Sequence, residues 1–513
     1  MFKFNSDIQM LKYEVLYKVA KLTLEDKLEE EYNKIPHEII PGSKPRFRCC
    51  VYKERAILEQ RTKLAMGKNL ERTLKYAIES EEPIIQVIDI ACEGCPIKRY
   101  RVTEACRGCL AHKCIEVCPR GAISIRDKRA HIDYDKCIEC GRCKDVCPYN
   151  AISDTLRPCI RSCAAKAIIM DEELKAVINY EKCTSCGMCT LACPFGAITD
   201  KSYIVDIIRA IKSGKKVYAL VAPAIASQFK DETVGQVKSA LKKLGFTDVV
   251  EVALGADLVA IEEAKEFSEK IGDIKVMTSS CCPAFVTHIR KSYPELIRNV
   301  STTVSPMTAI SKYIKKFDPD ALTVFIGPCT AKKSEIMRDE IKGITDYAMT
   351  FEEMVAVLDA AGIDIKEQED MKVEDATLFG RKFARSGGVV EAIKEAIKEM
   401  DIDIELNPVI CNGLEECDKT LKIMKAGKLP NNFVEGMACI GGCIGGAGVI
   451  NSNVNQSRLT VNKFGDTSTY KNIKERLDKL DIDEVDFHVP HEKIQINHEK
   501  SLKRESKKRW AYI

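Results

Sequence analysis

Sixteen of the 25 cysteines in this chain fall between residues 92 and 193, and their spacing constrains the fold more than any other feature. Runs of the form Cys-x2-Cys-x2-Cys-x3-Cys-Pro occur at 137–148 and 183–194, and a slightly longer version occurs at 106–119. A tight loop of this kind lets three thiolates reach one compact 4Fe–4S cubane, while the proline directs the chain away. We therefore expect this region to wrap around metal clusters rather than around an apolar core.

The first two cysteine runs have the arrangement of a two-cluster ferredoxin. In such a domain the fourth cysteine of each run binds the other cluster. The predicted ligand sets are Cys106, Cys109, Cys114 and Cys147 for one cubane, and Cys137, Cys140, Cys143 and Cys118 for the other. A zinc ribbon is the alternative, but it would use CxxC pairs separated by a long spacer.

The third run has a degraded partner half. Its own three thiols and the thiol at 163 predict a third cubane, held by Cys183, Cys186, Cys189 and Cys163. The four cysteines that remain in this region predict a fourth cubane, held by Cys92, Cys95, Cys159 and Cys193. The alternative is that Cys92 and Cys95 are unligated thiols beside three clusters. The prediction is therefore three to four accessory 4Fe–4S clusters.

Charge and hydropathy exclude several classes of protein. The net charge of the 513-residue chain is only +3, which argues against nucleic acid or a membrane surface as a partner. No signal-peptide core and no run of 18 apolar residues is present in the sequence. Because clustered, reduced cysteines require a reducing compartment, we expect a cytoplasmic protein of an anaerobe or of a cell that protects such clusters from oxygen.

The texture of the sequence changes along the chain. From about residue 203, apolar runs at 217–221, 248–252, 274–277 and 322–326 alternate with helix-like stretches, which is typical of an α/β domain with partly parallel sheets. The fold class we predict is multidomain α+β. We expect a helical N-terminal region at 1–90, a two-cluster ferredoxin-like domain at 91–150, a second ferredoxin-like domain at 151–202, an α/β domain at 203–475 and a basic C-terminal tail at 476–513.

Three further cysteine groups lie in the second half of the chain. They are Cys281-Cys282-Pro283, the Gly-Pro-Cys-Thr-Ala-Lys-Lys segment at 327–333, and the Glu-Gly-Met-Ala-Cys-Ile-Gly-Gly-Cys segment at 435–443. Cys282, Cys329, Cys439 and Cys443 are enough to hold one more cubane, and Cys281 is left without an obvious structural role. On a helix, the spacing of the last two would place both thiolates on one face.

These three segments resemble the signature segments of iron-only (FeFe) hydrogenases, over roughly residues 205–450. The resemblance implies an H-cluster, which is a 4Fe–4S cubane joined through one cysteine to a diiron unit with CO, CN⁻ and azadithiolate ligands. It also implies interconversion of protons plus electrons with molecular hydrogen. Carried over by position, Cys282, Cys329, Cys439 and Cys443 would hold the cubane, and Cys443 would bridge to the diiron unit.

The resemblance also implies roles for residues around the cluster. Lys332 would donate a charge-assisted hydrogen bond to a cyanide. Cys281 would pass a proton, a task that suits a thiol because its pKa can be brought near neutral. The rest of the proton path would be Glu263 and Glu266, three residues apart on a helix, with Ser305 completing it to solvent. The residues expected to line the diiron pocket are Met437 and the Val221-Ala222-Pro223 turn, with core packing as the competing interpretation.

The chain also departs from the best-known members of that family. Gly327 stands where a methionine usually precedes the Pro-Cys pair, and Ala284-Phe285 replace the usual Gly-Trp. The segment after Gly446 has Ala-Gly-Val in place of the usual Gly-Gln-Pro. Such changes around a metal site tune its potential and affinity. They indicate a divergent monomeric branch of the family.

We expect a ferredoxin or similar electron carrier as the redox partner and maturase enzymes as the source of the diiron unit. A non-catalytic iron–sulfur assembly scaffold is the main alternative, although it has no need of a proton path. A hydrogen sensor would be expected to carry a signalling domain, for which neither end leaves room, and a polyferredoxin carrier would not explain the α/β sequence. Cys49, Cys50, Cys411 and Cys417 are expected to be ordinary thiols.

Overall fold

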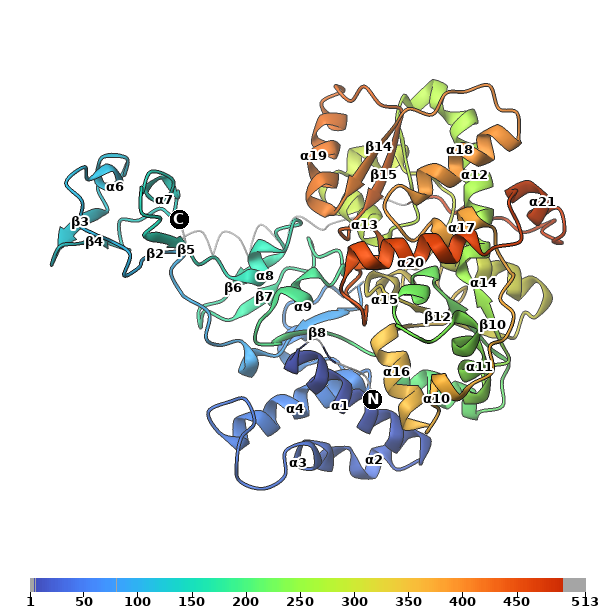
Figure 1. Ribbon diagram of the computed structural model, residues 1–513, viewed down its shortest axis with the longest axis horizontal. Coiled ribbons are helices and arrows are strands. Elements are labelled where there is room, and N and C mark those ends of the chain that lie inside the picture. Colours follow the sequence, from blue (N-terminus) through green and yellow to red (C-terminus); the bar gives the residue numbers. More distant parts are fainter. Residues whose placement is uncertain (1–3, 5, 80, 492–513) are drawn as a thin grey trace.

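The computed structural model describes residues 4, 6–79 and 81–491, so the basic stretch at 500–509 lies outside the described residues. Three parts follow one another across Figure 1. A small domain projects to the left as an arm, a second cluster-binding domain lies in the middle, and an α/β domain forms the right-hand side, with the N-terminal helices below the middle part.

The N-terminal region is helical, as predicted. Its elements are α1 (Asp7–Leu24), α2 (Leu28–Glu31), η1 (Tyr32–Lys34), α3 (Ile35–Ile39), α4 (Val51–Ala65) and α5 (Glu71–Leu74). Ser6 caps α1 by accepting a hydrogen bond from the Gln9 backbone amide at 3.3 Å. The buried face of α1 packs on α16 (Phe351–Ala360) of the α/β domain, where Lys12 pairs with Glu352 at 2.7 Å.

The arm is a ferredoxin-like unit of two short antiparallel ribbons. Its elements are β2 (Tyr100–Val102), α6 (Lys113–Glu116), β3 (Ile123–Arg126), β4 (Arg129–Ile132), α7 (Arg142–Asp145) and β5 (Ile152–Asp154). β2 pairs with β5, and β3 pairs with β4. Few apolar side chains fill its core, because the cysteine loops occupy most of the interior.

The middle domain is assembled from two separate stretches of chain. It consists of β1 (Ile85–Val87), η2 (Asp89–Ala91), α8 (Pro158–Arg161), β6 (Ile168–Met170), β7 (Ala176–Ile178), α9 (Met188–Ala192) and β8 (Ile198–Asp200). β1 pairs antiparallel with β8, which places the stretch that precedes the arm beside the stretch that follows it. The strand β1, which falls inside the predicted N-terminal region at 1–90, therefore belongs with 151–202, and the arm is inserted into this domain.

Two parallel sheets form the centre of the α/β domain. The first has the order β10-β9-β12-β13 and contains β9 (Val217–Val221), β10 (Asp248–Glu251), β12 (Leu322–Gly327) and β13 (Tyr347–Thr350). The second has the order β11-β15-β14 and contains β11 (Met277–Thr278), β14 (Pro408–Asn412) and β15 (Phe433–Met437). Short polar and glycine-rich segments follow the carboxyl ends of these strands, where α/β folds place their sites.

Helices cover both sheets. They are α10 (Ile204–Lys212), η3 (Pro223–Ser227), α11 (Val234–Leu244), α12 (Val252–Ile274), α13 (Pro283–Ser292), η4 (Pro294–Asn299), α14 (Pro306–Phe317), α15 (Ala331–Glu335), α16, η5 (Ile365–Glu367), α17 (Leu378–Lys382), α18 (Gly388–Glu399), α19 (Leu414–Lys425), η6 (Cys443–Gly445), α20 (Val454–Asp466) and α21 (Ile473–Leu477). The long helix α12 is buried over most of its length and packs on α14, α17 and α18. No helix in the described part of the chain is long and apolar enough to cross a membrane.

Two boundaries differ from the prediction. The strand expected at 274–277 begins only at Met277, because α12 continues through Ile274. The predicted tail begins inside α21, and residues up to 491 return to the α/β domain, where Phe487 is buried and His488 forms a β-bridge with Thr303.

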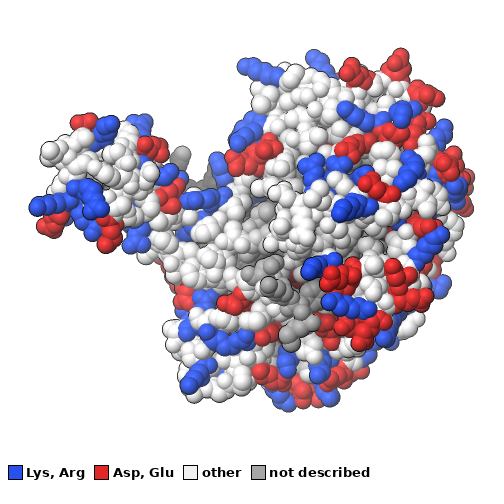
Figure 2. All heavy atoms as spheres, viewed as in Figure 1, with Lys and Arg blue, Asp and Glu red and all other residues white. Residues whose placement is uncertain are grey.

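A buried ion cluster joins the parts. Lys333 Nζ is fully buried and contacts Asp200 of β8 at 2.8 Å and Glu353 of α16 at 2.7 Å. Lys12 of α1 also pairs with Asp200, at 2.8 Å. Because removing one partner would leave a buried charge uncompensated, this cluster fixes the middle domain against the α/β domain. On the face in Figure 2, basic and acidic side chains are interspersed, in keeping with the small net charge.

Candidate active site

An apolar cavity of about 80 Å³ lies where both sheets end. All five cysteines singled out in the second half of the chain line it, namely Cys281, Cys282, Cys329, Cys439 and Cys443. The remaining lining includes Pro223 and Met437, the two side chains predicted to pack there. The structure therefore brings together residues that lie more than two hundred positions apart in the sequence.

The local fold explains how each thiol reaches the cavity. Cys282 is the N-cap of α13 and follows β11 closely, while Cys329 follows β12 after a single proline. Cys439 lies in the turn after β15 and Cys443 begins the 3-10 helix η6, so the two thiols do not share one face of an α-helix, the arrangement that their spacing would allow. The turn depends on Gly442, whose φ of 85° and ψ of −153° are open almost only to glycine.

The donors around the cavity fit an iron–sulfur cubane with an attached anionic group. Among the described residues, no three His, Cys, Asp or Glu side chains converge closely enough to hold a single metal ion, whereas four thiols surround a volume. Lys332 Nζ is buried at the cavity wall, 2.6 Å from Glu335 Oε2, yet neither atom has a hydrogen-bond partner among the described residues. An ammonium has three donors, so the Lys332–Glu335 ion pair leaves donors that could bind an anion in the cavity.

Gly327, one of the departures from the family pattern, has a structural counterpart. A Cβ at this position would lie 2.3 Å from the Phe325 ring, which itself lines the cavity. The ring thus occupies space that a larger residue at 327 would need. Phe285, the other departure, is fully buried against Gly436 of β15 and packs outside the cavity lining.

The other cysteines also gather in fours. Three separate cavities are lined by Cys106, Cys109, Cys114 and Cys147, by Cys118, Cys137, Cys140 and Cys143, and by Cys92, Cys95, Cys159 and Cys193. These are the groupings that the spacing predicts, the crossed exchange of Cys118 and Cys147 included. The last cavity is the most informative. Cys92 and Cys95 are far from Cys159 and Cys193 in the sequence, yet all four thiols line one cavity.

The fourth group lies next to the candidate active site. Burial raises the pKa of Cys189 far above its usual value, and the neighbouring thiols of Cys186, Cys183 and Cys163 raise it further, so these four lie together. Thr330, which follows the cavity residue Cys329, donates a hydrogen bond to the Ser185 carbonyl at 2.8 Å. A cluster held by this group would therefore adjoin the cavity of the α/β domain.

A repeated hydrogen bond marks the last cysteine of each ferredoxin-like loop. The backbone amide four residues further on donates to the sulfur at 3.2–3.3 Å in each of the pairs Ala122–Cys118, Ala151–Cys147, Ala167–Cys163 and Ala197–Cys193. Amide hydrogen bonds to cysteine sulfur stabilise the thiolate and tune the potential of a bound cluster. The repetition indicates that all four loops are shaped for the same ligand chemistry.

Two carboxyl groups lie behind Cys281 on α12. Glu263 is fully buried, and its Oε1 accepts hydrogen bonds from the Ser280 amide at 2.9 Å and the Ser280 hydroxyl at 3.1 Å. Burial raises the pKa of Glu263 to about 7, and the charge on Glu266 adds to the increase while the Ser280 hydrogen bonds oppose it. Burial also raises the pKa of the Cys281 thiol well above its usual range rather than bringing it near neutral.

Glu266 has the opposite character. Burial alone would raise its pKa, but the Lys270 ammonium and hydrogen bonds from Ser301 and Thr302 lower it to about 2. A proton on this carboxyl at neutral pH would cost about 7 kcal/mol, at roughly 1.4 kcal/mol for each of about five pH units. Glu266 is therefore ionised at neutral pH and would hold a proton only transiently.

The structure corrects one member of the predicted path. Ser305 is buried at the start of α14. Its hydroxyl oxygen lies 3.4 Å from the hydroxyl oxygen of Thr308. Ser301, four residues earlier, donates instead to Glu266 Oε2 at 2.5 Å. The sequence alone gave little reason to choose Ser301, because Ser301, Thr302, Thr303 and Ser305 all lie in one polar stretch whose register only the fold defines.

The four unassigned cysteines stay outside these groups. Cys411 donates to the Thr420 hydroxyl at 3.2 Å, and Cys417 lies 3.6 Å from the Met437 carbonyl oxygen. Cys49 is exposed and Cys50 is partly exposed.

Comparison with known proteins agrees with this geometry. The family model described as "Iron only hydrogenase large subunit, C-terminal domain" matches residues 215–447, and the model "4Fe-4S binding domain" matches 130–153 and 176–199. The periplasmic [Fe] hydrogenase large subunit of Nitratidesulfovibrio vulgaris is 32% identical over 62% of this chain and 85% of its own length. The chain belongs to the iron-only hydrogenase family and contains ferredoxin-like 4Fe–4S domains, which confirms the resemblance and the multidomain fold class.

The other relatives include both a hydrogenase and an iron–sulfur cluster assembly factor. Iron hydrogenase 1 of Clostridium pasteurianum is 31% identical over 63% of this chain, which spans 65% of that relative's length. A probable cytosolic Fe–S cluster assembly factor of Aedes aegypti is 26% identical over 44% of this chain and 59% of its own length. Among solved structures, one of an [FeFe]-hydrogenase gives a TM-score of 0.47 at 23% identity, over 54% of this chain and 92% of that chain. Family membership therefore establishes an iron–sulfur protein of hydrogenase type and leaves catalysis to be argued from the site.

Proposed function

We propose that this chain is an FeFe hydrogenase that interconverts protons plus electrons with molecular hydrogen. The observation that carries the proposal is the line of buried proton-carrying groups, Cys281, Glu263 and Glu266, beside the cavity lined by four further cysteines. A protein that only holds or hands on iron–sulfur clusters has no use for such a line. Burying two carboxyl groups is costly, and function is the usual reason for keeping them at a cavity.

The residues would divide the work as follows. The H-cluster, when bound through Cys282, Cys329, Cys439 and Cys443, supplies the redox-active metals at which hydrogen is formed or split. Lys332 holds a bound anion by its ammonium group, and Met437 and Pro223 exclude water from the same pocket. Cys281 would hold a proton at the cavity wall and exchange it with Glu263, whose pKa of about 7 suits transfer in either direction.

Electrons would reach the site through the accessory clusters. The arm holds two cysteine groups, the middle domain holds two more, and one of these adjoins the cavity. A ferredoxin or similar carrier docking on the arm would be the electron donor or acceptor, and maturase enzymes would supply the diiron unit. We place this activity in the cytoplasm, where such thiols stay reduced.

Isotope exchange tests this function. The chain is matured anaerobically and incubated with D2 in H2O, and formation of HD and H2 is followed by mass spectrometry. We expect rapid exchange, and loss of exchange with unchanged iron content in Cys281→Ala. The matched control is Cys417→Ala, which removes a buried thiol outside the cavity lining. Full exchange in Cys281→Ala would remove the relay role of this thiol.

The second candidate function is an iron–sulfur assembly or scaffold protein. It is favoured by the similarity to the assembly factors, whose matching region covers 44% of this chain for the Aedes aegypti relative. In that case the matured protein would show cluster transfer to an apo-ferredoxin but no isotope exchange.

A further inference from the structure

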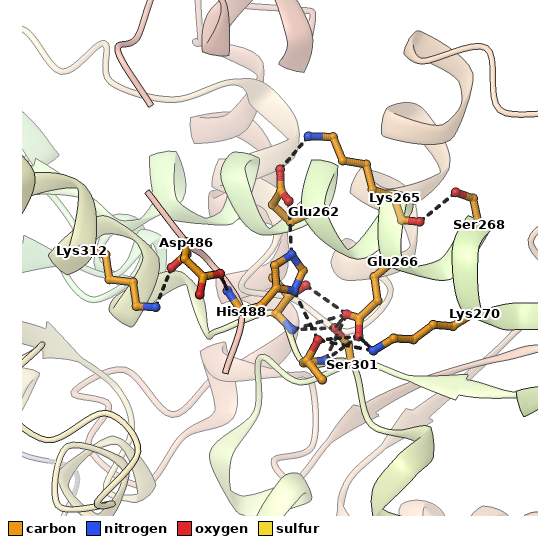
Figure 3. Close-up of polar contacts among 11 residues, drawn as sticks. Glu262, Lys265, Glu266, Ser268, Lys270, Ser301, Lys312, Asp486 and His488 are labelled. Atoms are coloured by element: carbon orange, nitrogen blue, oxygen red, sulfur yellow. Dashed lines mark hydrogen bonds and ion pairs between the residues drawn. The ribbon is translucent and has the colours of Figure 1, made fainter. Parts of the chain in front are cut away.

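A histidine on the returning C-terminal segment lies at the outer end of the buried carboxyl pair. His488 forms a β-bridge with Thr303, and the backbone on either side of it is bonded to the same stretch. The Val304 amide donates to the Phe487 carbonyl at 2.8 Å, and the Val489 amide donates to the Thr302 carbonyl at 2.7 Å. The imidazole is thus held rigidly against the polar stretch that contacts Glu266 (Figure 3).

The ring lies between two carboxyl groups, with a polar partner close to each of its nitrogens. Its Nδ1 lies 3.2 Å from Thr302 Oγ1, and that hydroxyl donates to Glu266 Oε1 at 2.7 Å. Its Nε2 lies 3.3 Å from Glu262 Oε2. Because Thr302 donates to Glu266, the imidazole Nδ1–H is the donor to Thr302, so the chain of bonds points inward from the ring to the buried carboxyl.

Exposure changes sharply along this chain of bonds. The side chain of Glu266 is only 3% exposed, whereas that of His488 is 37% exposed. The ring therefore reaches from a buried carboxylate to solvent. The other charged or titratable groups around it are Lys265 and Lys270 of α12, Lys312 of α14, Asp486 of its own segment and His491, which lies 2.8 Å from the Ser301 carbonyl oxygen (Figure 3).

We propose that His488 is the solvent-side proton carrier of this chain, exchanging protons between water and Glu266 through the Thr302 hydroxyl. In the inward step, Nε2 gains a proton from water or from Glu262. Nδ1 gives its proton to Thr302 Oγ1, and Thr302 gives its own proton to Glu266 Oε1. One proton enters and one arrives, and no electron moves. The step leaves the ring as its Nε2–H tautomer, and proton exchange of the exposed ring with water restores the Nδ1–H form before the next step. Hydrogen oxidation runs the same steps backwards. This role rests on the hydrogenase function proposed above.

Imidazole suits this position better than the neighbouring ammonium. Lys270 Nζ contacts Glu266 and lies 3.5 Å from Thr302 Oγ1, but an ammonium has no lone pair with which to accept a proton. A neutral imidazole presents a donor on one nitrogen and an acceptor on the other at the same time. His488 acts through Thr302 and Glu266 and is a positioned proton carrier, not a residue that touches the cofactor.

The first test is a pH profile of hydrogen evolution with chemical rescue. In His488→Ala we expect turnover at pH 8, where protons are scarce, to fall by about 10²-fold, the low end of what a positioned proton carrier contributes. The loss should shrink toward pH 6, and added imidazole should restore the rate, since the site is open to solvent. The matched control His37→Ala, an exposed histidine of α3, should keep the wild-type profile with and without imidazole.

A second test reads the contact without using activity. Diethyl pyrocarbonate modifies neutral imidazole, and peptide fragmentation separates His488 from His491. In Glu262→Ala, loss of the carboxylate that lies against Nε2 should speed the modification of His488 at a fixed neutral pH, and Glu269→Ala on the exposed side of α12 should not.

The outcomes separate the two proposals. A wild-type pH profile in His488→Ala, or a loss that imidazole does not restore, would overturn the carrier role while leaving the hydrogenase function intact. An unchanged rate of His488 modification in Glu262→Ala would also overturn it. A matured wild-type chain that makes no hydrogen would overturn the hydrogenase function, and the carrier role with it.

Discussion

Two glutamates three residues apart on α12 have different tasks because their surroundings differ. Glu263 is fully buried beside a carboxylate, and the hydrogen bonds from Ser280 and Ser301 offset only part of the effect, so its pKa rises to about 7. Glu266 is surrounded by donors and an ammonium, so its pKa falls to about 2. The first can hold a proton at neutral pH and the second can only pass one on. Such divergence between paired carboxyls is how one site supports both proton release and proton uptake.

The first residue-scale prediction concerns catalysis. Glu263→Gln keeps the shape of the side chain but cannot exchange a proton, so we expect hydrogen turnover to fall by about 10²–10⁴-fold. Iron content and the spectra of the clusters should stay unchanged, because Glu263 is not a cluster ligand. Glu269→Gln, an exposed carboxyl on the same helix, is the matched control and should retain full turnover. Turnover within twofold of wild type in Glu263→Gln would contradict the path.

The second residue-scale prediction concerns stability. Because the pKa of Glu263 is raised from 4.5 to about 7, the folded chain holds a proton that the unfolded chain releases between these values. Stability therefore falls as the pH rises through this window, by about 3 kcal/mol for this one group. Glutamine does not titrate, so raising the pH from 5 to 8 should destabilise wild type but not Glu263→Gln through this group. The thermal midpoint of the variant minus that of wild type should therefore be larger at pH 8 than at pH 5. An equal offset at both pH values would show that the carboxyl does not carry a raised pKa.

At the scale of elements, the sequence predicted what short-range chemistry determines. The strands at 217–221 and 322–326 and the cysteine loops follow from apolar runs and from ligand spacing. The turn at 439–443 was missed because Cys-x3-Cys suits a helix equally well, and only the two glycines at positive φ favour a turn. Ser301 and His488 were missed because their partners lie on α12, and no local pattern predicts contacts across the fold.

The turn at 439–443 carries a prediction of its own. A Cβ on Gly442 would lie 2.6 Å from the Ser386 amide nitrogen and 2.9 Å from the Ala384 carbonyl oxygen, both backbone atoms that cannot easily move. We expect Gly442→Ala to displace Cys439 and Cys443 and to lose about four irons per chain, one cubane. Iron analysis and electron paramagnetic resonance would report the loss. The control is Gly272→Ala, where a Cβ meets no atom within 4 Å, and this variant should keep the wild-type iron content. Wild-type iron content in Gly442→Ala would show that the turn does not depend on this glycine.

At the scale of the whole molecule, the parts follow one another in the order that the proposed electron transfer requires. The arm projects away from the α/β domain, and the middle domain lies between them (Figure 1). The pairing of β1 with β8 closes the middle domain around the inserted arm and brings Cys92 and Cys95 to Cys159 and Cys193. This grouping was predicted because these four cysteines remain once the other twelve are assigned to three cubanes. The insertion itself depends on strand pairing between distant segments and could not be predicted from spacing.

The prediction at this scale is the fourth accessory cluster. Cys92→Ser should remove about four irons per chain if its group of four thiols holds a cubane. Cys49→Ser, which changes an exposed thiol outside every group, should leave the iron content unchanged. Unchanged iron in Cys92→Ser would reduce the accessory set to three clusters.

The central claim is that the cavity at the ends of the two sheets holds a diiron unit attached to a cubane. Infrared spectroscopy of the anaerobically matured chain tests it most directly, because CO and CN⁻ ligands absorb where protein does not. If the diiron unit is bound, we expect bands in the CO and CN⁻ stretching region that shift under hydrogen and are lost in Cys443→Ala. Cubane signals without any such bands would contradict it and would favour the assembly-scaffold function.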